Sequence, residues 1–405
     1  MSIPADIVSL DDYERHARSR LPEATLAYVG GGAAGETTLR RNRDAFAARR
    51  LYARGLADFR NASARLRLFG LSLEAPIVVA PMALQRLAHP EGEIAMATGA
   101  RAAGCGMTVS CEASVDFARI AAAAPESLWL QLYLQPRRAD TLTLLRRAED
   151  CGYRAVVLTI DAPVNGVRDA ERRAGFTPPP GVSAVNLAGF RQATAARVAP
   201  ARSPVFRGLL DGAPCWDDVA WLRDQTRLPL LLKGVTHPDD AERALALGAD
   251  GLIVSNHGGR TLDMQPAAID LLPAIARRVA GRVPLLADGG VRRGTDALCA
   301  LALGASAVMV GRPLFWALAV GGAAGVAHAL ALLATELEAA MALTGRPTLA
   351  DIDDSIFVPD APADACGRAA AAPATRTRRQ PAAAARAPRR LSRLAPIPTP
   401  ESLDP

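Results

Sequence analysis

The sequence predicts an α/β protein in which eight parallel strands alternate with helices and close into a (β/α)8 barrel. Short, mostly apolar runs recur along the chain, at residues 76–82, 106–111, 129–134, 155–160, 228–235, 251–256, 284–290 and 307–313. Continuous apolar runs are typical of strands that helices cover on both faces. Stretches with the apolar spacing of helices lie between several of these runs, at residues 140–152, 239–249, 269–281 and 295–305. An open, doubly wound sheet is the alternative, but no G-x-G-x-x-G motif follows the first run.

Three parts of the chain differ in composition. The first 70 residues look helical and then irregular, and we expect a helical extension over residues 1–75 to contribute to the active site. Residues 76–356 hold the predicted barrel, in which residues 162–214 are long enough for an insertion or a lid over the barrel mouth. A tolerated surface loop is the alternative for this insertion. Residues 357–405 are rich in alanine, proline and arginine and lack the bulky apolar residues of a core, so we expect a disordered basic tail.

The formal charge of +6 comes mainly from that tail. From Ala361 onward there are eight arginines and three acidic residues, so the rest of the chain is nearly neutral and no nucleic-acid partner is expected. The six cysteines show neither CxxC nor zinc spacing, and no metal site is expected. No signal peptide or isolated membrane span is evident, which favours a cytoplasmic protein. The apolar stretch at residues 314–333 is expected to be a buried helix.

One segment combines a base with an anion-binding side chain. Residues 251–263 read GLIVSNHGGRTLD, in which an apolar run precedes His257 and Arg260. Histidine exchanges a proton near neutral pH, and arginine presents a planar set of donors that matches a carboxylate. Taken alone, the segment fits a strand followed by a polar loop equally well.

The residues at the ends of the predicted strands are mostly polar. Active sites of (β/α)8 barrels form at the C-terminal strand ends, which here carry Ala83, Ser110, Gln131, Tyr133, Thr159, Asp161, Lys233, His257, Asp288 and Arg312. The last two runs end in glycine-rich turns with Arg292 and Arg312, which predicts a phosphate site made of backbone N–H groups and a helix N-terminus. Lys233 is the only lysine among the 47 basic residues, which favours a role in the site.

Together these motifs resemble the FMN-dependent α-hydroxy-acid oxidases and dehydrogenases, the family of glycolate oxidase, lactate oxidase and mandelate dehydrogenase. The resemblance extends from Leu10 to Ile356. The motifs that carry it are AHPEGE (88–93), QLY (131–133), LTIDAP (158–163), LLKGV (231–235), SNHGGRTLD (255–263), DGGVRRGTDALCALALGA (288–305) and GRP (311–313).

The resemblance implies FMN as the cofactor, a homotetramer as the assembly, and roles for individual residues. It implies that His257 is the catalytic base, that Asp161 orients it, and that Tyr133 meets the substrate hydroxyl. It also implies that Tyr28, Arg168 and Arg260 bind the substrate. The implied contacts of the flavin ring, the ribityl chain and the phosphate are Ala83, Ser110, Gln131, Thr159, Lys233, Ser255, Asp288, Gly290, Arg292, Gly311 and Arg312.

Three residues bear on substrate and acceptor. Glu112 stands where several family members carry an aromatic residue that lines the substrate side chain, and Met82 replaces a smaller residue. We expect Glu112 to disfavour a purely aliphatic or an additionally anionic side chain, and an unchanged substrate profile in Glu112→Trp would contradict this. Ala83 matches an alanine frequent in the oxidases and favours O2 as the acceptor.

The leading interpretation is therefore FMN-dependent oxidation of an L-2-hydroxy acid to the 2-oxo acid, with electrons passed to O2 or another acceptor. One alternative is another FMN- or phosphate-binding barrel enzyme, such as a flavin-dependent isomerase. The other is a non-catalytic binding protein that acts through its basic tail.

Overall fold

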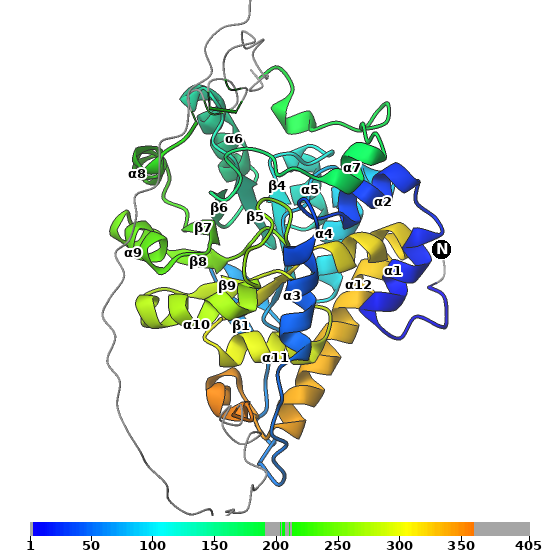
Figure 1. Cartoon of the computed structure of the whole chain (residues 1–405), viewed down its shortest axis with the longest axis vertical. Coiled ribbons are helices and arrows are strands. Elements are labelled where there is room, and N and C mark those ends of the chain that lie inside the picture. Colours follow the sequence, from blue (N-terminus) through cyan, green and yellow to red (C-terminus); the bar gives the residue numbers. More distant parts are fainter. Residues whose placement is uncertain (1–2, 191–202, 204, 207–209, 211–212, 360–405) are drawn as a thin grey trace, which may run out of the picture. The chain divides into compact units, whose positions relative to one another are not determined.

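Eight parallel strands close into a barrel, as the sequence predicts (Figure 1). The computed structural model describes residues 3–190, 203, 205–206, 210 and 213–359. The barrel strands are β3 (Ile77–Val79), β4 (Gly106–Ser110), β5 (Leu128–Leu132), β6 (Val156–Thr159), β7 (Leu230–Val235), β8 (Gly251–Val254), β9 (Leu285–Ala287) and β10 (Ala307–Val310). They follow one another around the barrel in chain order, and β10 pairs with β3 to close it. Of the expected tail, residues 357–359 are described, with Phe357 in an antiparallel bridge to Leu51, and residues 360–405 lie outside the described residues.

Helices cover the outside of the barrel after each strand. They are α4 (Glu93–Ala102), α5 (Phe117–Ala123), α6 (Arg138–Asp150), α8 (Trp216–Gln225), α9 (Pro238–Ala246), α10 (Ala268–Val279), α11 (Gly294–Ala302) and α12 (Arg312–Leu343). Short 3-10 turns lie at Gln85–Leu87, Val185–Leu187, Leu349–Asp351 and Asp354–Ile356. Because every barrel strand is buried, the inner residues fill the barrel and the outer ones pack under these helices.

The long helix α12 belongs to this outer layer. By length and composition it is apolar enough to cross a membrane, with a mean hydropathy of 1.9, and half of its most apolar window is buried. Its apolar residues form part of the main core, and it lies against α1 and α4 (Figure 1). Gly322 interrupts it with a non-helical backbone at φ 56°. The sequence expectation of a buried helix over residues 314–333 is confirmed.

A short hairpin closes the N-terminal end of the barrel. Strands β1 (Leu66–Leu68) and β2 (Leu71–Leu73) pair antiparallel, and their leucines join the inward-facing barrel residues in one apolar cluster. The indole N–H of Trp129 donates to the main-chain oxygen of Phe69 at 3.1 Å. The expectation that the first 70 residues end in irregular structure is wrong at β1. Each hairpin strand has only three residues, too few for a clear alternation of apolar and polar side chains.

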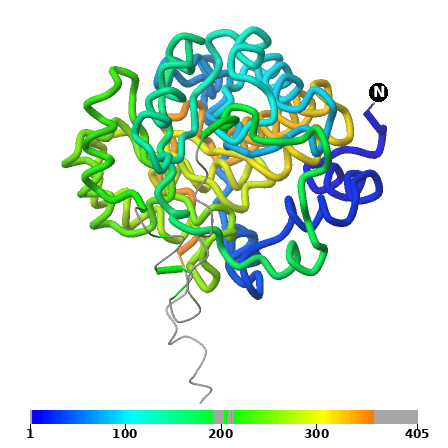
Figure 2. Tube along the Cα trace, turned by 90° about the horizontal axis from the view of Figure 1, so that it is seen from above, coloured from blue at the N-terminus to red at the C-terminus, as the bar shows by residue number. Residues whose placement is uncertain are grey.

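Three helices precede the hairpin and lie outside the barrel (Figures 1 and 2). They are α1 (Leu10–Arg18), α2 (Glu23–Gly30) and α3 (Thr37–Ala47). The helix α3 is joined to the segment after β8 by a buried pair of amides, in which Asn42 and Asn256 each donate to the other at 2.9 and 2.8 Å. The N-terminal segment is thereby fixed next to the C-terminal ends of the strands.

In the described part of the insertion after β6, the short helix α7 (Asp169–Arg173) lies beside α2 (Figure 1). Residues 191–202, 204, 207–209 and 211–212 of the insertion lie outside the described residues. Its first part reaches the barrel mouth, since Asn165, Gly166 and Arg168 line the pocket described below.

Replacing Gly290 by alanine is expected to destabilise the fold more than replacing Gly289. The two glycines have φ values of 95° and 90°, so alanine at either adds backbone strain of about 1–3 kcal/mol. A Cβ at Gly290 would also collide with the main-chain oxygen of Asn42, whereas one at Gly289 would meet side-chain atoms of Asn42 and Asn256 at 3.3 and 3.4 Å. Chemical denaturation of the two variants measures the difference. Equal free energies of unfolding would contradict the close packing of α3 on this turn.

Candidate active site

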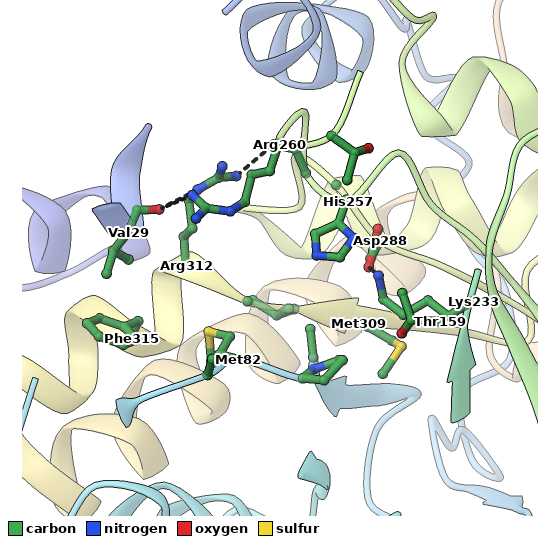
Figure 3. Close-up of a pocket in the computed structure, with 18 of the residues that line it drawn as sticks. Val29, Met82, Thr159, Lys233, His257, Arg260, Asp288, Met309, Arg312 and Phe315 are labelled. Atoms are coloured by element: carbon green, nitrogen blue, oxygen red, sulfur yellow. Dashed lines mark hydrogen bonds and ion pairs between the residues drawn. The ribbon is translucent and has the colours of Figure 1, made fainter. Parts of the chain in front are cut away.

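A pocket at the C-terminal ends of the strands brings together nearly all the predicted site residues (Figure 3). Those in its wall are Tyr28, Ala83, Ser110, Gln131, Tyr133, Thr159, Arg168, Lys233, His257, Arg260, Asp288, Gly290, Arg292, Gly311 and Arg312. Asp161 and Ser255 are not in the wall. They lie behind His257 and Lys233 and bind them, as described next. Within the described ranges, no group of three histidine, cysteine or acidic residues could hold a metal ion.

His257 is held by Asp161 in a fixed orientation. Its ring Nδ1 lies 2.9 Å from Oδ1 of Asp161, and its main-chain N–H donates to Oγ of Ser255 at 3.0 Å. The backbone of His257 is left-handed, with φ 57°. Gly234 makes room for the carboxylate, because a Cβ there would lie 2.5 Å from Cβ of Asp161. With Nδ1 occupied by Asp161, the ring nitrogen left for a proton transfer in the pocket is Nε2.

His257 in turn lowers the pKa of Asp161. Burial alone would raise the pKa of Asp161, but the charge and hydrogen bond of His257 and the charge of Lys233 lower it below its ordinary value. The carboxylate therefore stays ionised beside the ring Nδ1. This arrangement suits a base that accepts a proton during a reaction.

Replacing Asp161 by asparagine is expected to remove a stabilisation that depends on pH. Because the folded pKa of Asp161 is lowered, its contribution is present above the unfolded pKa, about 3.9, and is lost as pH falls through the folded pKa. The difference in free energy of unfolding between wild type and Asp161→Asn should be largest at neutral pH and shrink in acid. Asp150→Asn, an exposed change in α6, is the control. A difference that grows in acid would contradict the assignment.

Lys233 lies at the bottom of the pocket beside Asp288 (Figure 3). Its Nζ is 3.0 Å from Oδ2 of Asp288 and donates to Oγ of Ser255 at 3.0 Å, and the side chain is 4% exposed. Burial would lower the pKa of Lys233, but the carboxylates of Asp288 and Asp161 raise it above its ordinary value. The lysine is therefore a buried cation at neutral pH, able to stabilise negative charge in the pocket.

Several buried polar atoms of the wall have no hydrogen-bond partner in the described part of the chain. They are Nε2 of Gln131, Oγ1 of Thr159, Oδ1 of Asp288 and Nη1 of Arg292. Buried polar atoms are normally satisfied, so a set of them in one wall indicates a bound group that supplies both donors and acceptors. A flavin ring with its ribityl chain and phosphate has this chemistry, and the residues present fit it. Ser110 is adjacent and donates to Oε1 of Gln131 at 2.9 Å.

Cationic side chains gather at the opposite end of the pocket, where Arg312 and Arg260 lie beside Val29 (Figure 3). Arg312 donates to the main-chain oxygens of Val29, Gly31 and Gly258 at 2.9 to 3.0 Å. Burial, together with the charges of Arg260 and Arg292, lowers its pKa to about 9.

An anion at this end would offset the mutual repulsion of the three guanidinium groups. The backbone also favours an anion at this end of the pocket. Gly311 immediately precedes the N-terminus of α12, where free backbone N–H groups attract negative charge. The sequence did not foresee that Arg312 also binds the end of α2, and its role at a phosphate stays a prediction.

The predicted substrate residues, Tyr28, Tyr133, Arg168 and Arg260, line the same pocket. Arg260 lies over the ring of Tyr28, with Cζ 5.5 Å from the ring centre, and Tyr28 stacks on Phe176 at 4.2 Å. Burial and the charge of Arg168 lower the pKa of Arg260 to about 10. Burial raises the pKa of both Tyr28 and Tyr133, so their phenols stay protonated and can donate.

Sequence reasoning missed Asn42 and Arg43, which bring α3 into the pocket wall. One signal for Asn42 was present. It stands between Leu39 and Phe46 at helical spacing, on the face of α3 that is turned inward, and is 1% exposed. A polar residue on an apolar helix face indicates a specific partner, here Asn256.

The chain is similar in sequence and in fold to known proteins. Residues 17–359 match the family of FMN-dependent dehydrogenases. An L-lactate oxidase of Alicycliphilus denitrificans is 48% identical over 357 residues, which are 88% of this chain and 98% of that protein. Glycolate oxidase of Spinacia oleracea is 40% identical over 88% of this chain and 96% of its own length.

A solved structure of mandelate oxidase with (S)-2-phenylpropionate superposes with a TM-score of 0.77 at 41% identity, over 85% of this chain and 96% of that one. The FMN that the sequence predicts and the pocket accommodates is the cofactor of this family. The chain belongs to the FMN-dependent dehydrogenase family.

Proposed function

We propose that this enzyme oxidises an L-2-hydroxy acid to the 2-oxo acid and passes the electrons to O2. One observation carries the proposal: His257, whose ring is hydrogen-bonded to the Asp161 carboxylate behind it, shares a pocket wall with Arg260 and Tyr28. A base beside a carboxylate-binding pair is what removal of hydrogen from C2 of a hydroxy acid requires. The similar proteins named L-lactate oxidase and glycolate oxidase support the same reaction.

Different side chains bind the substrate and accept its proton. Arg260 and Tyr28 bind the substrate carboxylate, and Tyr133 donates to the hydroxyl, so that C2 is held in one orientation. His257 accepts a proton at Nε2, while Asp161 stabilises the resulting imidazolium. Arg168 is a second cation on this side of the pocket.

FMN, when bound, accepts the two electrons that leave the substrate. We assign its ring to Ala83, Ser110, Gln131, Thr159, Lys233 and Ser255, and its ribityl and phosphate groups to Asp288, Gly290, Arg292, Gly311 and Arg312. Ser255 acts through Lys233, since its hydroxyl accepts from Nζ and it is not in the wall. The positive charge of Lys233 favours the electron-rich state of the ring.

Anaerobic reduction of the yellow protein tests this function. Substrates from a panel of L-2-hydroxy acids are expected to bleach the flavin absorbance, and admission of air is expected to restore it with formation of hydrogen peroxide. Bleaching without recovery in air would replace O2 by another acceptor. If no 2-hydroxy acid bleaches the flavin, the proposed function is wrong.

We further propose a cytoplasmic homotetramer. The family resemblance supports the tetramer, and the free thiols of the described cysteines suit a reducing compartment. Light scattering of the purified protein and fractionation of cells measure the two properties. A monomer in solution, or enzyme recovered with membranes, would contradict them.

A further inference from the structure

The carboxylate of Glu112 is an acidic group in the pocket wall. Its backbone is fixed, because its N–H donates to Oγ of Ser110 at 3.1 Å and its carbonyl accepts from the N–H of Leu84 at 3.3 Å. Throughout the described residues, no hydrogen bond or ion pair reaches the carboxylate itself. Burial raises the pKa of Glu112, and the charge of Arg168 opposes that rise. The guanidinium of Arg168 is itself paired with Glu171 at 2.9 Å.

Tyr28 and Tyr133, two neighbours of Glu112, indicate which part of a substrate it would contact. Its charge contributes to the raised pKa of both Tyr28 and Tyr133, after the larger effect of burial, so it lies close to both phenols. In the proposed function, Tyr28 binds the substrate carboxylate and Tyr133 binds its hydroxyl. Glu112 would therefore contact the remaining part of the substrate, the side chain on C2.

We propose that Glu112 selects 2-hydroxy acids whose side chain carries a neutral hydrogen-bond donor, such as a hydroxyl group on C3. This inference rests on the proposed function and names the class of substrate for it. A purely aliphatic side chain would cover a carboxylate without satisfying it, which is unfavourable for a buried acceptor. A second carboxylate would be repelled. A cationic side chain would meet Arg168 and Arg260, which lie in the same wall.

The test compares L-glycerate with L-lactate, which differ by one hydroxyl group on C3, and adds L-malate for the second carboxylate. The wild-type enzyme is expected to show the highest kcat/KM with L-glycerate. Glu112→Leu removes the acceptor, and the ratio of kcat/KM for glycerate over lactate should fall about tenfold or more, as expected for a lost hydrogen bond to a charged group. Glu112→Gln keeps an acceptor oxygen without the charge. It should retain the preference for glycerate and lose the exclusion of L-malate.

Binding of oxo acids gives a second readout without turnover. Pyruvate and hydroxypyruvate are expected to perturb the flavin absorbance when they bind. Wild type should bind hydroxypyruvate more tightly, whereas Glu112→Leu should not. Glu338→Gln, an exposed change in α12, controls for loss of a negative charge. Flavin content and circular dichroism identify a variant that fails to fold, in which case Glu112→Gln carries the test through its L-malate result.

The outcomes separate the two proposals. A wild-type preference for lactate, or unchanged ratios in Glu112→Leu, overturns the role of Glu112 while oxidation of either acid leaves the proposed function standing. Absence of flavin reduction by every 2-hydroxy acid overturns the proposed function.

Discussion

Replacing His257 by glutamine is expected to lower kcat by about 10²–10⁴, the range that a positioned general base contributes. Glutamine cannot accept a proton, although it fills a similar space and can still meet Asp161. The loss should appear in the rate of anaerobic flavin reduction at saturating substrate, because that rate isolates the step in which His257 acts. Binding of FMN should persist, since no predicted flavin contact is removed.

The matched control is His16→Gln, a change in α1 at a histidine that pairs with Asp6 on the surface. It is expected to reduce the flavin at the wild-type rate. If His257→Gln also reduced the flavin at that rate, the base would have to be another residue. Loss of the flavin from His257→Gln would instead indicate that the left-handed backbone at this position, φ 57°, also shapes the cofactor site.

Replacing Lys233 by methionine is expected to destabilise the protein by about 3–5 kcal/mol, because it leaves a buried carboxylate without its counter-ion. Asp288 loses the ammonium at 3.0 Å, and Asp161 loses a charge that keeps it ionised. The variant should also retain less FMN. Thermal unfolding followed by circular dichroism measures the first effect, and flavin absorbance per protein measures the second.

The double variant Lys233→Met with Asp288→Asn provides the control, since it removes both charges. It should recover part of the stability, and the non-additivity of the two changes gives the coupling energy of the pair. The stabilisation that Lys233 contributes should decrease at high pH. Because the folded pKa of Lys233 is raised, its stabilisation is full below the unfolded pKa and is lost as pH rises through the folded pKa. Additive effects would mean that the ion pair contributes little.

The barrel was predictable because its strands are buried on both faces, which leaves continuous apolar runs in the sequence. The positions of Lys233 and His257 followed from the same pattern, since both stand at strand ends. The hairpin that closes the barrel was not predictable in this way. Its strands are three residues long, and what holds them is contact with residues such as Trp129, which lies about sixty positions away.

Some hydrogen bonds of the site could not be predicted from the sequence, because they join residues that are far apart in the chain. Arg312 was expected at a phosphate, and the structure adds its bonds to Val29 and Gly31, more than 280 residues earlier in the chain. Ser255 was also expected at the flavin, and the structure shows its hydroxyl accepting a hydrogen bond from Lys233, 22 residues away in the chain. No local pattern records either arrangement, because each depends on how distant segments fold together.

The solitary lysine has a practical consequence outside catalysis. A lysine-specific protease can cut this sequence at one bond only, between Lys233 and Gly234. Both residues lie near the C-terminal end of β7 and are buried, so the bond is inaccessible until the barrel opens. Appearance of two fragments, residues 1–233 and 234–405, would therefore report opening of the barrel itself. At a protease concentration where cleavage is faster than reclosing, the rate of that single cut measures how often the folded enzyme opens under native conditions.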